Sequence, residues 1–203
     1  MKTFDTVAKL KLAKLKTGQF VETGGYHTKG DAGGAKYLIV APQAFDGYGD
    51  HELANGNVAV LQISESVNVK KFGALANGTQ QEDVLQAAVD YLSGGGTIII
   101  DSAYKCHGIK IVNSGITLDG VGFKGQLYRE DSNPTWIVDV ELDPSQQGRR
   151  FNIDGLYIVG NTINPIERGL ILKNVYGDSE INCSFLGLQS CMQLGHVYGV
   201  KFT

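Results

Sequence analysis

The stretch Val67-Asn68-Val69-Lys70-Lys71-Phe72-Gly73-Ala74 separates two dissimilar parts of this chain. A short apolar run ends there at Phe-Gly-Ala, a glycine-bearing loop follows, and the next segment is helical in pattern. Thr79 and Glu82 have the spacing of a capping box, in which each side chain satisfies one free amide at the start of a helix. We therefore expect a helix over about residues 79–93.

The expected helix has one apolar face. Its positions follow the i, i+3, i+4, i+7 spacing of an amphipathic helix and are Leu85, Ala88, Val89 and Leu92. Gly94-Gly95-Gly96 ends the pattern, as glycine commonly does at a helix C-terminus. A helix of this kind must bury its apolar face against another element.

Short apolar runs replace helical patterns after residue 96. Glycine, asparagine or aspartate separates them, and they cover residues 97–100, 109–112, 116–118, 136–140, 151–159, 169–172 and 181–185. This pattern is typical of short β-strands joined by tight turns.

A repeat of 22 residues is visible near the end of the chain. Leu172-Lys173-Asn174-Val175-Tyr176-Gly177 recurs as Leu194-Gly195-His196-Val197-Tyr198-Gly199, and Leu118 to Val121 and Ile153 to Leu156 are weaker copies of a related turn. A period near 20 residues built from short strands predicts a solenoid, whose coils stack to share one core. Tyr176 and Tyr198 should then lie one above the other.

The first 65 residues predict a small, separate β-rich module. Asp5 is positioned to cap a helix over Thr6–Lys16, with Ala8, Leu12 and Leu15 as its apolar stripe. Strands are expected over residues 19–22, 35–41 and 58–63, and Asn55-Gly56 predicts a type I′ hairpin turn. We place the boundary at residues 64–66, which gives domains 1–65 and 66–203.

Composition excludes several classes of protein. The chain has 203 residues, 42% of them hydrophobic and 19% charged, a balance that favours a folded core. The net charge of −3 provides no basic surface for nucleic acid, and no apolar run is long enough to span a membrane. Cys106, Cys183 and Cys191 lack zinc-ligand spacing, so we expect reduced, buried thiols and assembly in a cytoplasm.

Residues 1–65 resemble the particle-proximal module of bacteriophage tailspikes. The shared pattern is Phe-x-Thr-Val-Ala at Phe4 to Ala8, a Thr-x-Gly-Tyr turn at Thr23 to Tyr26, and Gly-Asp-x-Gly-Gly-Ala-x-Tyr at Gly30 to Tyr37. The glycines indicate turns too tight for a β-carbon.

Residues 67–203 resemble the start of the pectate-lyase-type right-handed parallel β-helix of tailspikes and polysaccharide depolymerases. In that family Phe-Gly-Ala leads to a Thr-Asp-Asp-Thr run that opens the capping helix. This chain has Thr79 followed by Gln80-Gln81-Glu82 instead. In the family this run has a structural role, so its replacement here does not bear on catalysis.

The resemblance implies a mainly β fold, in which the N-terminal module precedes a capping helix and the first coils of the β-helix. It further implies a homotrimer in the virion tail, assembled in the host cytoplasm. Residues 1–65 would contact other tail or baseplate proteins, and the β-helix would bind capsule or lipopolysaccharide. Because no closing cap follows Val200 to Thr203, we expect further coils or another chain beyond them.

Glycan cleavage needs paired carboxylates, roughly 5 Å apart in retaining and 6.5–9.5 Å apart in inverting hydrolases, or a base beside a sugar carboxylate in lyases. The carboxylates on predicted coils are Asp139, Glu141, Asp154, Glu167, Asp178 and Glu180, of which Asp154, Glu167, Asp178 and Glu180 are the catalytic candidates. Solvated outer-face carboxylates are the alternative interpretation. We expect the complete active site to lie outside this chain.

Trp136, Arg149 and Arg150 are the candidate substrate-binding residues. Trp136 follows Asn133-Pro134, and the arginines lie in the segment 143–150 that, like the loop 130–134, interrupts the coils. The arginines could bind an acidic sugar or serve a trimer interface. The histidines have no metal-ligand spacing, so no metal or cofactor is expected.

Three functions remain open from the sequence. The first is a tailspike segment whose full-length protein attaches to the virion and depolymerises bacterial surface polysaccharide as a hydrolase or lyase. The second is a non-catalytic glycan-binding fibre or adhesin. The third is a purely structural virion connector.

Overall fold

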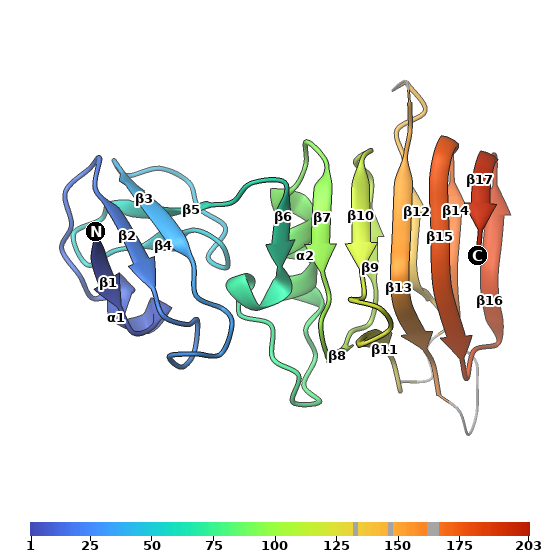
Figure 1. Ribbon diagram of the computed structural model, residues 1–203, viewed down its shortest axis with the longest axis horizontal. Helices are drawn as coiled ribbons and strands as arrows, with labels where there is room; N and C mark the ends of the chain where they lie inside the picture. The colour runs from blue at the N-terminus through green and yellow to red at the C-terminus, as the bar shows by residue number, and fades with distance from the viewer. Residues whose placement is uncertain (132–133, 146–147, 162–166) are drawn as a thin grey trace. The chain divides into compact units, whose positions relative to one another are not determined.

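A computed structural model describes residues 1–131, 134–145, 148–161 and 167–203 (Figure 1). Parts of the predicted loops 130–134 and 143–150 therefore lie outside the described residues. The chain forms two compact units, Met1–Ala74 and Leu75–Thr203. We expected a boundary after residue 65, and the assignment of residues 1–65 as a separate functional module stays a prediction.

The first unit is built on a mixed five-stranded sheet with the strand order β1-β2-β3-β5-β4. These strands are β1 (Lys2–Phe4), β2 (Phe20–Thr23), β3 (Lys36–Val40), β4 (His51–Glu52) and β5 (Val58–Gln62). β1 is parallel to β2, and the other pairs are antiparallel. Tyr37 and Ile39, alternate residues of β3, are fully buried and belong to the core of this unit. The unit ends with β6 (Ser66–Asn68) and a 3₁₀ turn, η1 (Val69–Phe72).

The helix of the first unit is shorter than the sequence predicts. α1 spans Val7–Lys11, and the cap is the Thr6 hydroxyl, which accepts a hydrogen bond from the Lys9 amide at 3.3 Å. Asp5 instead pairs with the Lys9 ammonium group. Of the predicted stripe, Leu15 is buried, whereas Ala8 and Leu12 are exposed and Val7 and Leu10 are buried in their place. Val7 and Leu10 are at i and i+3 of the helix, so the buried side is a different helical face from the predicted one.

The turn at Asn55-Gly56 differs from the predicted type I′ turn. Only Gly56 has a positive φ, 79°, whereas type I′ requires positive φ at both central residues. The Gly56 amide donates to the Leu53 carbonyl at 2.9 Å, and the Leu53 amide donates to Asn57 at 2.8 Å. The side chains of Asn55 and Asn57 both donate to the Leu15 carbonyl, which fixes the longer turn.

The glycine-rich loop of the first unit is organised by Asp31. Its carboxylate accepts hydrogen bonds from four backbone amides, those of Tyr26, His27, Thr28 and Gly33, at 2.8–3.0 Å. Gly25 is required here, because a β-carbon would lie 1.8 Å from the Thr28 carbonyl oxygen. The glycine-rich motif recognised in the sequence therefore forms a loop that is folded around the Asp31 carboxylate.

The second unit consists of a helix, α2 (Glu82–Tyr91), and a stack of parallel strands (Figure 1). The strands are β7 (Gly96–Ile99), β8 (Ala103–Lys105), β9 (Ile109–Ile111), β10 (Ile116–Asp119), β11 (Gly125–Tyr128), β12 (Trp136–Glu141), β13 (Phe151–Val159), β14 (Arg168–Lys173), β15 (Tyr176–Leu186), β16 (Ser190–Gly195) and β17 (Tyr198–Phe202). The predicted runs are confirmed as strands, whereas β8 and β11 were missed because they are short, and β16 because Ser190 and Gln193 interrupt its apolar residues.

α2 begins later than predicted and is not closed by a capping box. Gln81 is the N-cap residue and makes no side-chain cap. The Gln81 amide instead donates to the Lys105 carbonyl of β8 at 2.8 Å, and Glu82 contacts His107. Pairing with the first coil thus replaces the local cap. The predicted apolar face is confirmed, since Leu85, Ala88, Val89 and Leu92 are all buried.

Successive coils stack in parallel register, which makes the second unit a parallel β-helix. Ile98, Leu118, Ile153 and Ile181 are register partners in turn, and all four are buried. The first half of β13 pairs with β10 and its second half with β11, with a bulge at Gly155 where the strand changes direction. A second sheet has the order β16-β14-β12-β9.

The 22-residue repeat is confirmed as one coil. Leu172 pairs with Leu194, and the rings of Tyr176 and Tyr198 stack with centroids 5.2 Å apart. Asn174 and His196, which occupy equivalent repeat positions, both have positive φ, 58° and 54°. All three cysteines are free, but only Cys106 is fully buried, whereas Cys191 is exposed because it lies on the outer part of the last coil.

Candidate functional site

Two rows of polar side chains run across the outer face of the β10-β13-β15 sheet. One row follows the register Thr117, Asn152, Glu180 and Lys201, and the other follows Asp119, Asp154 and Asn182. They face outward because they alternate with the buried residues Leu118, Ile153 and Ile181. The coils thus place hydroxyl, amide, carboxylate and ammonium groups in line across the coil stack.

Hydrogen bonds connect the members of each row. The Asn182 amide donates to the Asp154 carboxylate at 3.1 Å, and the Asn152 amide donates to the Thr117 hydroxyl at 3.3 Å. Lys201 pairs with Glu180 at 2.7 Å. These contacts run from coil to coil, so the side chains are ordered by their neighbours.

A pocket of about 390 Å³ lies on this face. Its lining residues are Thr117, Asn152, Ile153, Asp154, Asp178 and Glu180. The structure therefore brings together three of the four carboxylates selected from the sequence. We call this pocket, together with the two polar rows, the outer groove.

Basic side chains lie beside the carboxylates of the outer groove. Arg150 approaches Asp178 at 3.3 Å, and both side chains are exposed. Asp178 follows Gly177 in a backbone irregularity of β15 and has a φ of 31°. None of the three carboxylates is enclosed in the apolar setting that keeps a catalytic acid protonated in glycosidases. The groove is thus equipped to hydrogen-bond sugar hydroxyls.

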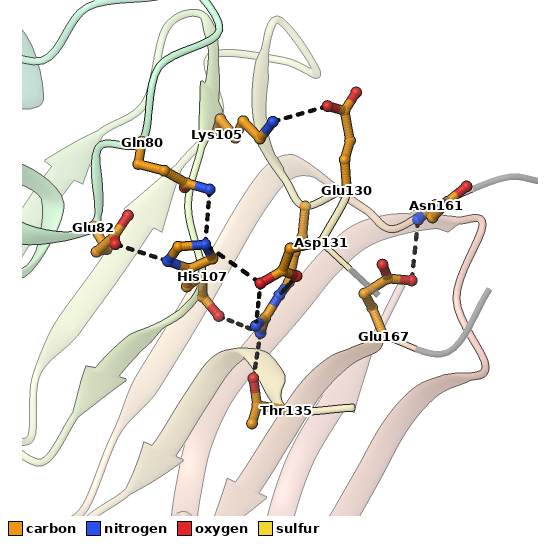
Figure 2. Close-up of polar contacts among 10 residues, drawn as sticks. Gln80, Glu82, Lys105, His107, Glu130, Asp131, Thr135, Asn161 and Glu167 are labelled. Carbon is orange, nitrogen blue, oxygen red and sulfur yellow. Dashed lines mark hydrogen bonds and ion pairs between the residues drawn. The ribbon is translucent and has the colours of Figure 1, made fainter. Parts of the chain in front are cut away.

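Glu167 is separated from the other three candidates. It is fully buried at the start of β14, where its carboxylate accepts a hydrogen bond from the Asn161 amide at 3.2 Å. Its carbonyl also accepts one from the Gln189 amide at 2.9 Å. Figure 2 shows the Asn161 contact beside a second polar region of the β-helix.

A second pocket, of about 580 Å³, lies in that region. It is lined by residues of β8, β11 and the end of β13, namely Ala103, Gln126, Tyr128, Arg129, Glu130, Val159, Gly160 and Asn161. Glu130 at its rim pairs with Lys105 at 3.0 Å, as Figure 2 shows. Tyr128 is the one aromatic residue in the lining of this pocket, which also includes charged and amide side chains.

Arg129 is the least expected residue in this region. Its side chain is 1% exposed although it carries a full charge. Asp131 binds the guanidinium through both carboxylate oxygens, and the Thr135 hydroxyl and the His107 carbonyl accept further hydrogen bonds. A buried charge is tolerated when it is paired and fully hydrogen-bonded in this way.

His107 extends this network to the capping helix. Its Nδ1 lies 2.8 Å from the Glu82 carboxylate, and its Nε2 lies 3.3 Å from Asp131 and 2.8 Å from the Gln80 amide (Figure 2). One imidazole thus joins the first turn of α2 to the residues that hold Arg129. The network secures the helix to the first coils.

Two of the three predicted binding residues, Trp136 and Arg149, are outside the lining of both pockets. Trp136 begins β12, and Arg168 of the next coil lies over its ring at 5.7 Å. Arg149 lies over Tyr176 at 4.0 Å, in line with the Tyr176–Tyr198 stack. Arg150 alone reaches the outer groove, through Asp178. The Tyr176–Tyr198 stack therefore connects two successive coils, as the repeat predicted.

Several residues of the groove were missed from the sequence. Thr117, Asn152 and Asn182 are polar residues at alternate positions of apolar runs, and aligning the weak repeats at Leu118 and Ile153 already matches Thr117 with Asn152. Arg129 continues the buried alternation of Gly125 and Leu127. No comparable signal marks Asp131 or Thr135 as its partners.

Two further observations are limited to the described part of the chain. Residues 1–131, 134–145, 148–161 and 167–203 contain no group of three or more histidine, cysteine, aspartate or glutamate side chains arranged to hold a metal ion. Within the same ranges, no helix has the length and apolarity needed to cross a membrane.

Similarity to solved structures extends over the whole chain. The enzymatically active domain of tailspike protein 2 from bacteriophage CBA120 matches 98% of this chain with a TM-score of 0.66 and 13% identity. The tailspike protein gp49 of Acinetobacter baumannii bacteriophage Fri1, described as a capsular polysaccharide depolymerase, matches all of it with a TM-score of 0.64 and 16% identity. The tailspike of Acinetobacter phage vB_ApiP_P1 also matches all of it, with a TM-score of 0.62 and 14% identity.

The matches cover 36%, 46% and 39% of those structures, so this chain spans less than half of their length. No protein-family model and no curated protein sequence matches the chain. At such low sequence identities, the similarity to these structures is evidence for the fold alone. With its glycine-looped β module, capping helix and stacked parallel coils, the chain has a tailspike-like fold.

Proposed function

We propose that this chain is the N-terminal part of a phage tailspike whose β-helix binds bacterial capsule or lipopolysaccharide in the outer groove. The observation that carries the proposal is the outer groove itself. Four carboxylates, two amides and a hydroxyl from three successive coils lie on the outer face of one sheet. Sugar-binding sites combine such polar groups to fix the orientation of the ligand.

The direction of the groove suits a polymer. Its polar rows run from β10 through β13 to β15, and the Glu180–Lys201 pair continues one row to β17. Each added coil therefore offers hydrogen-bonding groups to a further sugar unit. A chain of linked sugars can gain affinity from several weak contacts of this kind.

Cleavage is the finer part of the proposal and belongs to the full-length protein. The fold resembles that of proteins described as depolymerases. Asp154, Asp178 and Glu180 are all exposed, however, whereas the general acid of a glycoside hydrolase is typically set in an apolar pocket. We propose that Asp154, Asp178 and Glu180 bind the glycan, and that residues outside this chain complete the active site.

The first unit has a separate proposed role. We propose that residues 1–65 attach the protein to other tail or baseplate proteins of the virion, and that the whole protein is a homotrimer. The resemblance of the Gly30 to Tyr37 loop to tailspike modules supports this role. A labelled full chain should bind spike-free phage particles, and a chain that lacks residues 1–65 should not.

The decisive experiment measures binding and turnover on a panel of purified capsular polysaccharides and O-antigens. We expect the chain to bind one of them, and Asp154→Asn and Glu180→Gln to weaken that binding at least about tenfold, equivalent to about 1.4 kcal/mol. The matched control is Glu141→Gln, an exposed glutamate on β12 of the other sheet that pairs with Lys173. Reducing ends and unsaturated sugars report cleavage.

Each result selects one of the open functions. Binding with cleavage by this chain would show that the groove is catalytic and that Asp154, Asp178 and Glu180 act on the glycan. Binding without cleavage by either this chain or the full-length protein indicates an adhesin. Binding to virions alone indicates a structural connector and contradicts the proposed role of the groove.

A further inference from the structure

The coil that contains β10 and β11 has a turn that the next coil lacks. Asp119 pairs with Asp154, and Gly125 pairs with Leu156, so residues 120–124 stand opposite the single residue Gly155. In solenoid proteins such insertions lie on one face, which is often the binding face. The insertion begins directly after Asp119, at the edge of the outer groove.

The backbone of this insertion is strained. Val121, Gly122 and Phe123 have consecutive positive φ values of 52°, 63° and 65°. This region is unfavourable for residues with a β-carbon, and most of all for a β-branched valine. We call these three residues the left-handed turn. Strain of this kind persists only where the surroundings hold it and is concentrated at functional sites.

Backbone contacts hold the left-handed turn in place. The Phe123 amide donates to the Gly155 carbonyl of the next coil at 2.6 Å, and the Lys124 amide donates to the Gly120 carbonyl at 2.9 Å. The Val121 amide donates to the Asp119 carboxylate at 2.7 Å. Gly120 is required, because a β-carbon there would lie 2.1 Å from the Gly155 carbonyl oxygen.

The strained turn places apolar side chains at the surface. Val121 and Phe123 are 38% and 37% exposed, and Tyr157 of β13, at 40%, lies beside Phe123 with ring centroids 5.3 Å apart and a tilt of 59°. Polar side chains at these exposed positions of the turn would have lost no buried apolar area. Instead, an aromatic pair is held at the surface by a backbone that is rigidly bonded to the next coil.

The turn that carries Phe123 is bonded to residues at the edge of the outer groove. Asp119 accepts the hydrogen bond that begins the turn, and Asp154 precedes Gly155, which the turn contacts. We propose that Phe123 and Tyr157, supported by Val121, form a stacking subsite for a pyranose ring of the glycan that the outer groove binds. This inference rests on the proposed function and names the contact that would hold the apolar face of the sugar.

The chemistry of the surroundings favours a sugar over a protein. The register neighbours of Tyr157 are Gln126 and Ser184, so polar groups border the rings on both sides. Three partly exposed side chains are far smaller than the roughly 800 Å² per partner of a stable protein interface. A pyranose presents one face of C–H groups to an aromatic ring and hydroxyls at its edge to carboxylates and amides.

The test uses the full 203-residue chain with Phe123→Asn and Tyr157→Thr. Asparagine tolerates positive φ, so Phe123→Asn removes the ring while it relieves the backbone. Threonine suits the strand position of Tyr157. We expect each variant to weaken binding to the polysaccharide selected from the panel at least about tenfold. Phe123→Asn should leave the melting temperature unchanged or raise it, whereas Tyr157→Thr, which only loses the ring pair, should lower it. Phe45→Asn, at an exposed phenylalanine of the first unit, is the control and should bind as the parent does.

The outcomes separate this inference from the proposed function. If Asp154→Asn weakens binding and Phe123→Asn does not, the groove binds glycan and the stacking subsite is wrong. If Phe123→Asn instead shifts the sedimentation coefficient to a smaller species, the rings contact a second copy of the chain, which also overturns it. If no polysaccharide of the panel binds, NMR titration of the chain with simple methyl glycosides tests both proposals. Unperturbed Phe123 and Tyr157 ring signals would then refute both proposals.

Discussion

The two units of this chain hold irregular backbone in place by different means. In the first unit, the loop from Gly25 to Gly33 is folded around one carboxylate, that of Asp31, which accepts four amides within its own loop. In the second unit, the left-handed turn is held by the carbonyl of Gly155 in the next coil. The loop of the first unit is held by a side chain of its own segment, whereas the left-handed turn is held only because the coils stack.

This difference shows where each unit is vulnerable. A single side chain organises the loop of the first unit, so that its loss should affect that unit alone. The β-helix is supported by repeated register, and one of its weak points is the buried charge of Arg129. Trp136, the only tryptophan, reports the unfolding of the second unit, which lets the two units be followed separately.

The largest expected effect comes from Arg129→Met. The substitution leaves Asp131, the Thr135 hydroxyl and the His107 carbonyl without the guanidinium, and removing one member of a buried pair commonly costs about 3–5 kcal/mol. We expect the free energy of unfolding followed by Trp136 fluorescence in urea to fall by this amount. Arg150→Met, which removes an exposed pair with Asp178, should change it little. A loss below about 1 kcal/mol for Arg129→Met would show that the network is dispensable.

Acid should destabilise the first unit through His51. This side chain is 1% exposed, and its ring nitrogens have no hydrogen-bond partner among the described residues. Burial, with a smaller contribution from the Lys11 charge, lowers the pKa of His51 to about 4. The unfolded chain takes up the proton near pH 6.5, so stability is complete above that pH and decreases as the pH falls toward 4. The total loss is about 3 kcal/mol.

Calorimetry between pH 4 and 7 tests this dependence. His51→Phe, which keeps a ring beside Tyr26 and Tyr37, should remove most of the decrease. His196→Phe, at an exposed histidine of the second unit, should leave it unchanged. An equal pH dependence in the His51→Phe variant would refute the role of this histidine.

Asp31→Ala should destabilise the first unit by about 2 kcal/mol, because four amides lose a charged acceptor. Partial burial opposes the charge of Asp31, but the amides of Thr28, Gly33, Tyr26 and His27 together hold its pKa below the usual value. This contribution is therefore present above about pH 3.8 and is lost as the pH falls through the lower folded pKa. Asp46→Ala removes an acceptor of only two amides and should have a smaller effect. Near-ultraviolet circular dichroism of the tyrosines reports the change, and equal losses for the two variants would contradict the organising role of Asp31.

Tyr198→Ala should have the smallest effect, about 1 kcal/mol, since an aromatic pair contributes about 0.5–1.5 kcal/mol. The loss should disappear when Tyr176 is first replaced by leucine, because the partner ring is then absent. A double-mutant cycle in urea measures this coupling. An additive result would mean that the two rings stack without stabilising the coil.

The sequence predicted the elements of the β-helix better than those of the first unit. Alternating residues such as Ile116, Leu118 and Ile153 specify inward and outward faces wherever the coil is straight. In α1, by contrast, helical spacing fits both Val7 with Leu10 and Ala8 with Leu12, and only burial in the first unit selected the first pair. The capping box at Thr79 was displaced for a similar reason, since pairing with Lys105 occupied the backbone before the helix.

The site was predicted in part. Asp154, Asp178 and Glu180 meet in the outer groove, but Glu167, chosen by the same criterion, is buried elsewhere. Trp136 and Arg149 had the right chemistry for sugar and were placed in stacking contacts with Arg168 and Tyr176 instead. Residue type alone could not distinguish a side chain that packs on the next coil from one that faces the groove.

The sequence by itself determined the period of the coils, their apolar core and the capping helix, because these depend on spacing along a continuous segment. Only the tertiary structure decided which polar residues share a surface. Thr117, Asn152 and Glu180 are neighbours because the coil returns to the same position after loops of unequal length. The same stacking buries Arg129 and holds Phe123 in a left-handed turn, since the partners of both come from distant parts of the chain.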